Sequence, residues 1–115
     1  MDPPHGKPRL NAATLSALAD PNRLRIVELL RAGPLAVGEI AERLGLHQPQ
    51  ASKHLRVLGE AGLVTALPSA NRRIYRLRPE PLQELDAWLS SFSRTWVDQL
   101  DRLDDYLERL RPPDG

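Results

Sequence analysis

The sequence predicts a mainly α (α+β) fold in a single domain. Three patterns indicate it. Apolar residues recur at helical spacing in short segments that end at Gly or Pro, two short β-type runs flank a turn-rich tetrapeptide, and a long apolar stripe lies near the C-terminus. The 115 residues are enough to build one hydrophobic core but too few for two independent ones.

Two short helices are predicted to open the domain. Asn11 is a favourable N-cap for a helix over residues 12–19, which stops at Asp20-Pro21. Asp20 can cap a second helix that has Pro21 at its first position and stops at Gly33 after about three turns. Apolar residues form a stripe on each helix: Leu15, Leu18 and Ala19 on the first, and Leu24, Val27 and Leu30 on the second.

Two further helices are predicted over residues 37–44 and 48–61. The first ends at Gly45, and the second has Pro49 in its first turn and is closed by Gly62. The inward residues are Val37, Ile40, Ala41 and Leu44 on the first, and Ala51, Leu55, Leu58 and Ala61 on the second. Two short helices joined by about three residues that include Gly are typical of a helix-turn-helix.

A β-hairpin and a long helix are predicted to complete the domain. The runs LVTAL and RRIYRL flank the turn-rich PSAN, which predicts a two-stranded β wing. The long helix would extend about 45 Å, more than a small core requires, so its surplus apolar stripe predicts pairing with another chain. That stripe contains Leu82, Leu85, Leu89, Phe92, Trp96, Leu100, Leu103, Leu107 and Leu110.

Three stretches carry a resemblance to a known family. LADPNRLRIVELL, LAVGEIAERLGLHQPQASKHLRVLGEAGLV and the wing NRRIYRL resemble the ArsR (arsenic-repressor-like) winged helix-turn-helix repressors, over about residues 12–110. The resemblance implies a cytoplasmic transcriptional repressor that occupies a double-stranded DNA operator as a homodimer joined mainly by its first and last helices. The interface expected on this basis contains Leu15, Leu18, Leu85, Leu89, Phe92, Trp96, Leu100, Leu103 and Leu107.

Charge is distributed unevenly along the chain, although the formal net charge is only +1. Residues 43–78 contain seven basic residues and one acidic residue, whereas residues 79–115 contain four basic and nine acidic residues. A basic segment of this kind is typical of a surface that faces nucleic-acid phosphates. The alternative interpretation is an ordinary solvated surface.

The helix over residues 48–61 is predicted to present its polar side to a DNA groove. Gln can pair bidentately with adenine, Ser can bond several base edges, and Lys or Arg can reach guanine or phosphate. The residues expected to contact DNA are Gln48, Pro49, Gln50, Ser52, Lys53, His54 and Arg56 on this helix, and Asn71, Arg72 and Arg73 at the wing tip.

Three of the candidate phosphate contacts are weaker. His54 flanks the buried side of its helix, so a structural role in packing is as reasonable as a phosphate contact. Arg23 and Arg25 lie early in the second helix and are further candidates for phosphate contacts.

Metal, cofactor and enzyme chemistry are not predicted. The chain has no cysteine. Where metal-sensing relatives have a Cys-x-Cys pair, it has Ala36 and Gly38, and its last histidine is His54, so the familiar ligand sets are missing. The remaining oxygen-rich set, Asp2, His5, Asp86 and Asp98, is sparse. There is no phosphate-binding Gly-rich loop, no nucleophile with an evident base, no signal peptide and no membrane-spanning segment.

The sequence leaves the domain's use and its trigger open. Winged helices also serve as protein-interaction modules that do not bind DNA. A small organic inducer could bind near the aromatic residues Trp88, Phe92, Trp96 and Tyr106, or the protein could be an autorepressor without an inducer. Residues 1–10 are expected to form a flexible arm, residues 11–110 the domain, and residues 111–115 a disordered tail.

Overall fold

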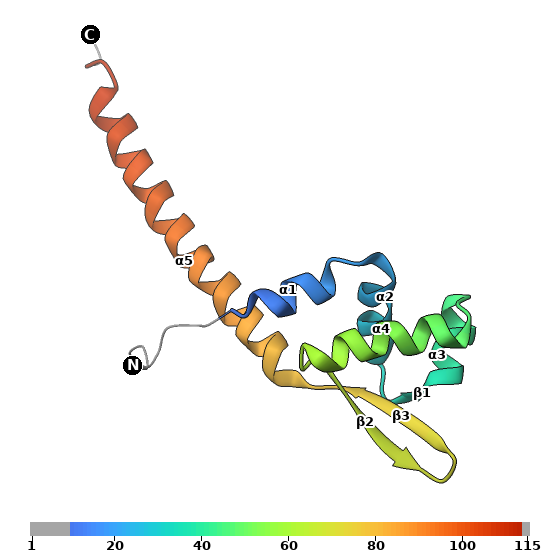
Figure 1. Cartoon of the computed structure of the whole chain (residues 1–115). Helices are drawn as coiled ribbons and strands as arrows, with labels where there is room; N and C mark the ends of the chain where they lie inside the picture. The colour runs from blue at the N-terminus through green and yellow to red at the C-terminus, as the bar shows by residue number, and fades with distance from the viewer. Residues whose placement is uncertain (1–9, 114–115) are drawn as a thin grey trace. The chain divides into compact units, whose positions relative to one another are not determined.

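The computed structural model describes residues 10–113. In chain order the elements are α1 (Ala12–Leu18), α2 (Pro21–Leu30), β1 (Leu35–Ala36), α3 (Val37–Leu44), α4 (Gln48–Glu60), β2 (Val64–Ser69), β3 (Arg72–Leu77) and α5 (Pro79–Leu110) (Figure 1). The described residues form two compact units that divide within α5, residues 10–83 and residues 84–113. Most of the predicted arm and the end of the predicted tail lie outside the described residues.

The helix boundaries follow the predicted caps. The Asn11 side chain accepts a hydrogen bond from the Ala13 N–H at 2.9 Å and begins α1. Asp20 begins α2 by accepting the N–H groups of Asn22 and Arg23 at 2.8 and 3.1 Å. Gly45 ends α3 at a φ of 68°, a left-handed conformation that costs glycine little. The hydrogen bonds to the Asn11 and Asp20 side chains satisfy N–H donors that the first turn of a helix leaves without partners.

The winged helix-turn-helix fold is confirmed, and its sheet contains one strand more than the hairpin. The order is β1-β3-β2, all antiparallel, with Leu35 opposite Tyr75 and Ala36 opposite Ile74. Strand β1 has only two residues, too few to show the alternation by which strands are recognised in a sequence.

The hairpin turn is shorter than the predicted PSAN tetrapeptide. Pro68 pairs with Arg73 and Ser69 with Arg72, which leaves Ala70 and Asn71 at the turn. Pro68 is tolerated because β2 is an edge strand, where a missing N–H need not break a ladder. Ala70 has a φ of 55°, an uncommon value for a residue with a side chain.

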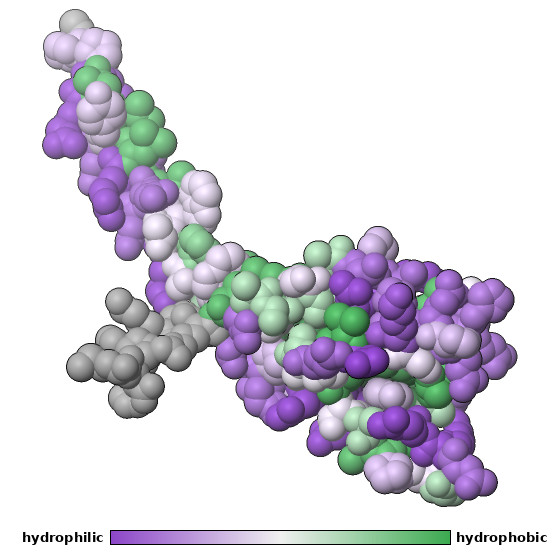
Figure 2. Space-filling model, in the orientation of Figure 1, coloured by the Kyte–Doolittle hydropathy of each residue, from purple (hydrophilic) through white to green (hydrophobic). Residues whose placement is uncertain are grey.

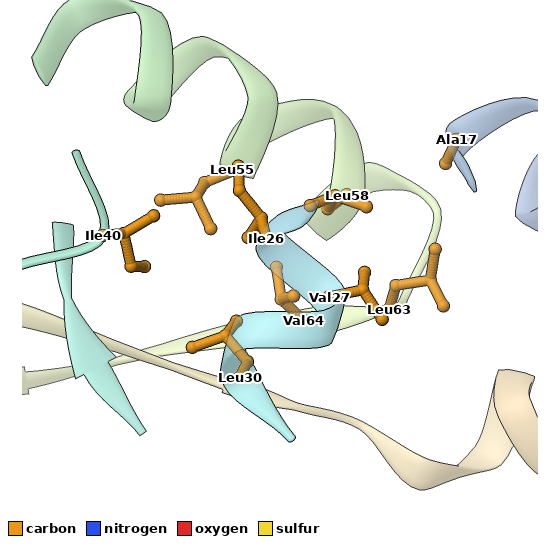
Figure 3. Packing of buried hydrophobic residues seen from close by; sticks show 9 residues of the cluster. All are labelled: Ala17, Ile26, Val27, Leu30, Ile40, Leu55, Leu58, Leu63 and Val64. Atoms are coloured by element: carbon orange, nitrogen blue, oxygen red, sulfur yellow. The ribbon is translucent and has the colours of Figure 1, made fainter. Parts of the chain in front are cut away.

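The hydrophobic core joins the first four helices to the sheet. Figure 3 shows Leu55 and Leu58 of α4 packed with Ile26 of α2, and all three are fully buried. Burying one such side chain is worth about 1.5–3 kcal/mol. The predicted inward stripes of α3 and α4 are confirmed, but on α2 Ile26 is buried and Leu24 is 47% exposed. Leu24 lies outside the face that Ile26, Val27 and Leu30 share.

Helix α5 begins at Pro79, three residues before Leu82, the first residue of the predicted stripe. Pro79 and Pro81 are compatible with this start because they lie in the first turn, where a backbone N–H is not required. Leu82 packs against the core. No residue of α5, all of which the structure describes, is buried, and its apolar side chains lie at the surface (Figure 2). Within residues 10–113, no helix combines the length and apolar character that crossing a membrane would need.

Two leucines of α2 test this assignment of the core. Leu30→Ala removes a side chain that is 3% exposed, and we expect it to lower the free energy of unfolding by about 2–5 kcal/mol through lost burial and a residual cavity. Leu24→Ala is the matched control on the same helix and should cost less than about 1 kcal/mol. Urea unfolding at one fixed protein concentration measures both, and equal losses would contradict the assignment.

Candidate nucleic-acid interface

The exposed side of α4 is set by its buried side. Ala51, Leu55 and Leu58 have no exposed surface. The polar residues predicted to face outward do so: Gln48, Pro49, Gln50, Ser52, Lys53 and Arg56 are all exposed. A 13-residue helix with one continuous polar face has the shape that the DNA major groove admits.

Two grooves adjoin this face. One, of about 650 Å³, lies between the N-terminal turns of α3 and α4 and the wing tip, and includes Gln48, Ser52 and Asn71. The other, of about 450 Å³, lies between α4 and the wing strands and includes Arg56 and Tyr75. Val37, Ser52 and Arg73 line both grooves. The structure therefore brings part of the predicted set to one surface, namely Gln48, Ser52 and Arg56 of α4 and Asn71, Arg72 and Arg73 of the wing, whereas Pro49, Gln50, Lys53 and His54 line neither groove.

Gln50 has a structural role that the sequence analysis did not anticipate. Its side-chain oxygen accepts the backbone N–H of His47 at 3.0 Å, one half of a capping box at the start of α4. Bidentate reading of adenine needs both the oxygen and the nitrogen of a glutamine amide, and this oxygen is already engaged. Gln48 and Ser52 are therefore the better candidates for base contacts.

The two wing arginines differ in their surroundings. Arg72 donates from Nη2 to Oε1 of Glu39 at 2.7 Å. The Ala36 N–H is the main cause that lowers the pKa of the Glu39 carboxyl, and the charges of Arg72 and Arg43 lower it further. Arg73 makes no ion pair with any residue in the range 10–113.

His54 is half-buried and does not belong to the exposed polar face of α4. Its side chain is 19% exposed, and Nδ1 is 3.9 Å from Oδ1 of Asp20. That nitrogen is buried and has no hydrogen-bond partner among the described residues. Of the two interpretations of His54, this position favours the structural one.

Arg23 and Arg25 are engaged with backbone carbonyls. Arg23 Nε donates to the Ala17 carbonyl at 2.7 Å, and Arg25 Nη2 donates to the Leu44 carbonyl at 3.1 Å. Both arginines therefore tie the ends of helices together, and this geometry does not favour them as phosphate contacts.

Glu39 and Glu42 line the candidate surface, and the sequence analysis did not predict them. Both line the larger groove, close to Gln48 and Arg72. The sequence signal for Glu39 is its spacing, three residues after the N-cap residue Ala36, where a Glu side chain can cap the preceding backbone. Its carboxylate does so, because Oε1 accepts the Ala36 N–H at 3.0 Å.

Metal ligands do not gather in the part of the chain that the structure describes. Among residues 10–113 there is no group of three or more His, Cys, Asp or Glu side chains placed to hold an ion. Asp2 and His5, two members of the sparse set considered above, lie outside the described residues.

Comparisons with known proteins agree with this geometry. A family model for a helix-turn-helix domain matches residues 18–65. The chain is 49% identical over 76 residues to the HTH-type transcriptional regulator Rv2034 of Mycobacterium tuberculosis. This match covers 66% of this chain and 71% of that protein. It is 35% identical over 72 residues to the arsenical resistance operon repressor of Staphylococcus xylosus, covering 63% of this chain and 69% of that protein.

A solved structure gives the same comparison in three dimensions. It is the homodimeric winged helix-turn-helix DNA-binding domain of a Mycobacterium bovis protein, called a possible ArsR-family transcriptional regulator. The TM-score is 0.61 at 35% identity, and the match covers 72% of this chain and 77% of that chain.

The N-cap of α2 predicts a pH dependence of stability. The hydrogen bond from the Arg23 N–H is the main cause that lowers the pKa of Asp20 below 3.8, and the Asn22 N–H and the nearby His54 and Arg23 side chains add to it. A lowered pKa in the folded state means that the carboxylate stabilises the fold above that pH, and that this contribution is lost as the pH falls through the folded pKa.

We expect Asp20→Asn, which keeps a good capping residue and removes the charge, to lower the melting temperature by a few degrees at pH 7. The gap from the unmodified protein should begin to narrow below about pH 4, near the pKa of an unfolded Asp, and close as the pH falls through the lowered pKa of the folded state. Asp98→Asn, on the exposed surface of α5, is the control for loss of one negative charge. A gap that does not narrow as the pH falls below about 4 would show that the carboxylate charge is not the cause.

Proposed function

The chain belongs to the ArsR family of winged helix-turn-helix transcriptional regulators, and on this basis we propose that it is a repressor that binds an inverted-repeat operator in double-stranded DNA as a homodimer. The observation that carries the proposal is the single surface on which the polar face of α4 and the wing arginine Arg73 line adjoining grooves. In this proposal residues 11–110 act as one DNA-binding and dimerisation domain.

The helix and the wing have different tasks in this proposal. Gln48 and Ser52, in the first half of α4, approach base edges in the major groove. Lys53 and Arg56 are exposed farther along the same face. Lys53 contacts phosphate or guanine, whereas Arg56, whose Nε lies 3.3 Å from Oε1 of Glu60, has to leave that ion pair to do so. Arg73 contacts the DNA phosphate backbone beside the wing, where counterion release favours binding of a cation whatever the base sequence.

The homodimer is supported by the apolar surface of α5. Its exposed residues include Phe92 at 45%, Leu100 at 54% and Leu103 at 49%. A contiguous apolar stripe of this length exceeds what soluble monomers usually expose, and pairing with a second copy covers it. The Mycobacterium bovis domain described above is itself homodimeric. Two-fold symmetry in the protein in turn requires an operator made of two inverted half-sites.

The trigger for release from DNA is a separate question. The familiar metal ligands are missing at Ala36 and Gly38, so we propose a regulator that does not respond to metal through those sites. Trp88 and Phe92 stack edge to face on α5, with ring centroids 4.7 Å apart. This aromatic pair is where a small organic inducer would bind if the protein has one.

Base reading by α4 predicts a loss of selectivity in helix variants. Gln48→Ala or Ser52→Ala should cost about 1–3 kcal/mol on a duplex selected by this protein from a random library, and little on a scrambled duplex. Arg73→Ala should weaken both duplexes alike and reduce the slope of log affinity against log salt by about 1 for each lost phosphate contact, or about 2 for a dimer that loses both copies of Arg73. Fluorescence titrations at several salt concentrations measure both effects.

Gln50→Glu is a useful comparison in the same titrations, because Glu at this position retains an oxygen that can cap α4. Equal losses on the selected and scrambled duplexes from Gln48→Ala and Ser52→Ala would remove base reading from α4. If neither the unmodified protein nor any variant binds a duplex, the result favours the alternative that this winged helix is a protein-interaction module.

Pairing through α5 predicts that dimerisation and DNA binding fail together. Leu103→Asp places a charge in the apolar stripe, and we expect monomers at micromolar concentration together with at least about tenfold weaker DNA binding. Ser90→Asp adds the same charge on the polar side of α5 and should leave the dimer intact. Analytical ultracentrifugation decides the first point, and a compact monomer of the unmodified protein would contradict the proposal.

A further inference from the structure

The wing tip, residues 69–73, extends beyond the three-stranded part of the sheet. Strand β1 pairs with β3 only at Tyr75 and Ile74. At Arg73 and Arg72, β3 pairs only with the edge strand β2. Two-stranded hairpins are marginally stable in water, so a tip of this kind needs another contact to hold a fixed position.

Glu39 supplies that contact. Its Oε1 accepts the Ala36 N–H at 3.0 Å and the Arg72 Nη2–H at 2.7 Å. Ala36 is both the last residue of β1 and the N-cap of α3. The carboxylate therefore ties the wing to α3 just past the last pair of the β1–β3 ladder. Within residues 10–113, no other ion pair joins the wing to a helix.

Arg72 and Arg73 consequently differ in what they can offer to DNA. Both arginines line the larger groove, where Arg72 meets Glu39, but only Arg73 also lines the smaller groove between α4 and the wing strands. The charge of Arg72 is already matched by Glu39, so this pair adds little net positive charge to the surface. Counterion release depends on cations that neutralise phosphates, and an arginine paired in this way is poorly placed to do so.

We propose that Arg72 is a positioning residue, not a phosphate contact: its ion pair with Glu39 holds the wing tip on α3 so that Arg73 faces the groove beside α4. The proposal rests on the DNA-binding function proposed above. Its physical benefit is preorganisation, because a wing ordered before binding does not have to be ordered on the DNA.

The first test does not involve DNA. Glu39→Gln keeps an oxygen that can accept the Ala36 N–H, since Gln also serves at this capping position, and removes the charge that pairs with Arg72. Amide hydrogen exchange at residues 69–73 should become about two- to fivefold faster in Glu39→Gln and in Arg72→Gln, the factor expected for one exposed ion pair. The double variant should exchange no faster than either single variant.

Glu42→Gln is the matched control for that measurement. Glu42 lies on the same helix and lines the same groove, but forms no ion pair with the described residues. Exchange at the wing tip should be unchanged in this variant. Unchanged exchange in Glu39→Gln as well would overturn the positioning role, whatever the protein binds.

The second test uses a random-sequence duplex of about 30 bp, long enough for two half-sites one helical turn apart. The double variant Glu39→Gln/Arg72→Gln has the net charge of the unmodified protein. It should bind about two- to fivefold more weakly with an unchanged salt slope, whereas Arg73→Ala should lower the slope by about 1 for each chain of the dimer. Glu39→Gln should bind about two- to fivefold more weakly than Glu42→Gln, which has the same net charge.

A salt slope lowered by about 1 per chain in the double variant would overturn the proposal, because it would show that Arg72 contacts phosphate. Equal binding by Glu39→Gln and Glu42→Gln would also overturn it. If the unmodified protein binds no duplex at any salt concentration, the proposed DNA-binding function fails, and the exchange measurement still decides whether Glu39 positions the wing.

Discussion

The burial of one face of α4 is the constraint on which the candidate surface depends. Ala51, Leu55 and Leu58 are fully buried, and Leu55 and Leu58 belong to the core cluster with Ile26 and Ile40. Successive helical residues differ by about 100°, so a one-residue change in the register of α4 would turn Ser52 into the core. Packing energy therefore determines which side chains face outward, and the polar face of α4 follows from it.

Features with a local cause were predictable, whereas those with a distant cause were not. The N-caps Asn11 and Asp20 and the stop at Gly45 act within a few residues, so the sequence analysis placed these helix ends correctly. Strand β1 exists because it pairs with β3, almost forty residues along the chain. The Glu39–Arg72 ion pair likewise spans 33 residues, and no periodicity or spacing rule reports such a contact.

Counting charges along the sequence overstated the positive charge that the surface offers. Residues 43–78 contain seven basic residues, but Arg72 pairs with Glu39 at 2.7 Å and Arg56 with Glu60 at 3.3 Å. Arg78 lies 3.9 Å from Glu80. These exposed pairs contribute little to stability, yet each leaves less net charge to attract phosphate. Lys53 on α4, and Arg73 and Arg76 on the wing, are exposed and form no ion pair with a described residue, so they are the cations that these elements have most clearly available.

Because each chain has a small number of available cations, the proposed pairing through the apolar stripe of α5 has a direct consequence for DNA binding. Affinity for phosphate rises with the number of phosphates neutralised, so a surface with few available cations binds weakly alone. Linking two such surfaces makes the second contact intramolecular, which raises affinity without any new contact to DNA. In the proposed dimer the exposed residues of α5, such as Trp96 at 61% and Leu103 at 49%, supply that link by burial against a second copy. On this proposal, the apolar residues of α5 raise the affinity for DNA although they do not contact it, whereas Ser52 and Arg73 provide selectivity and position.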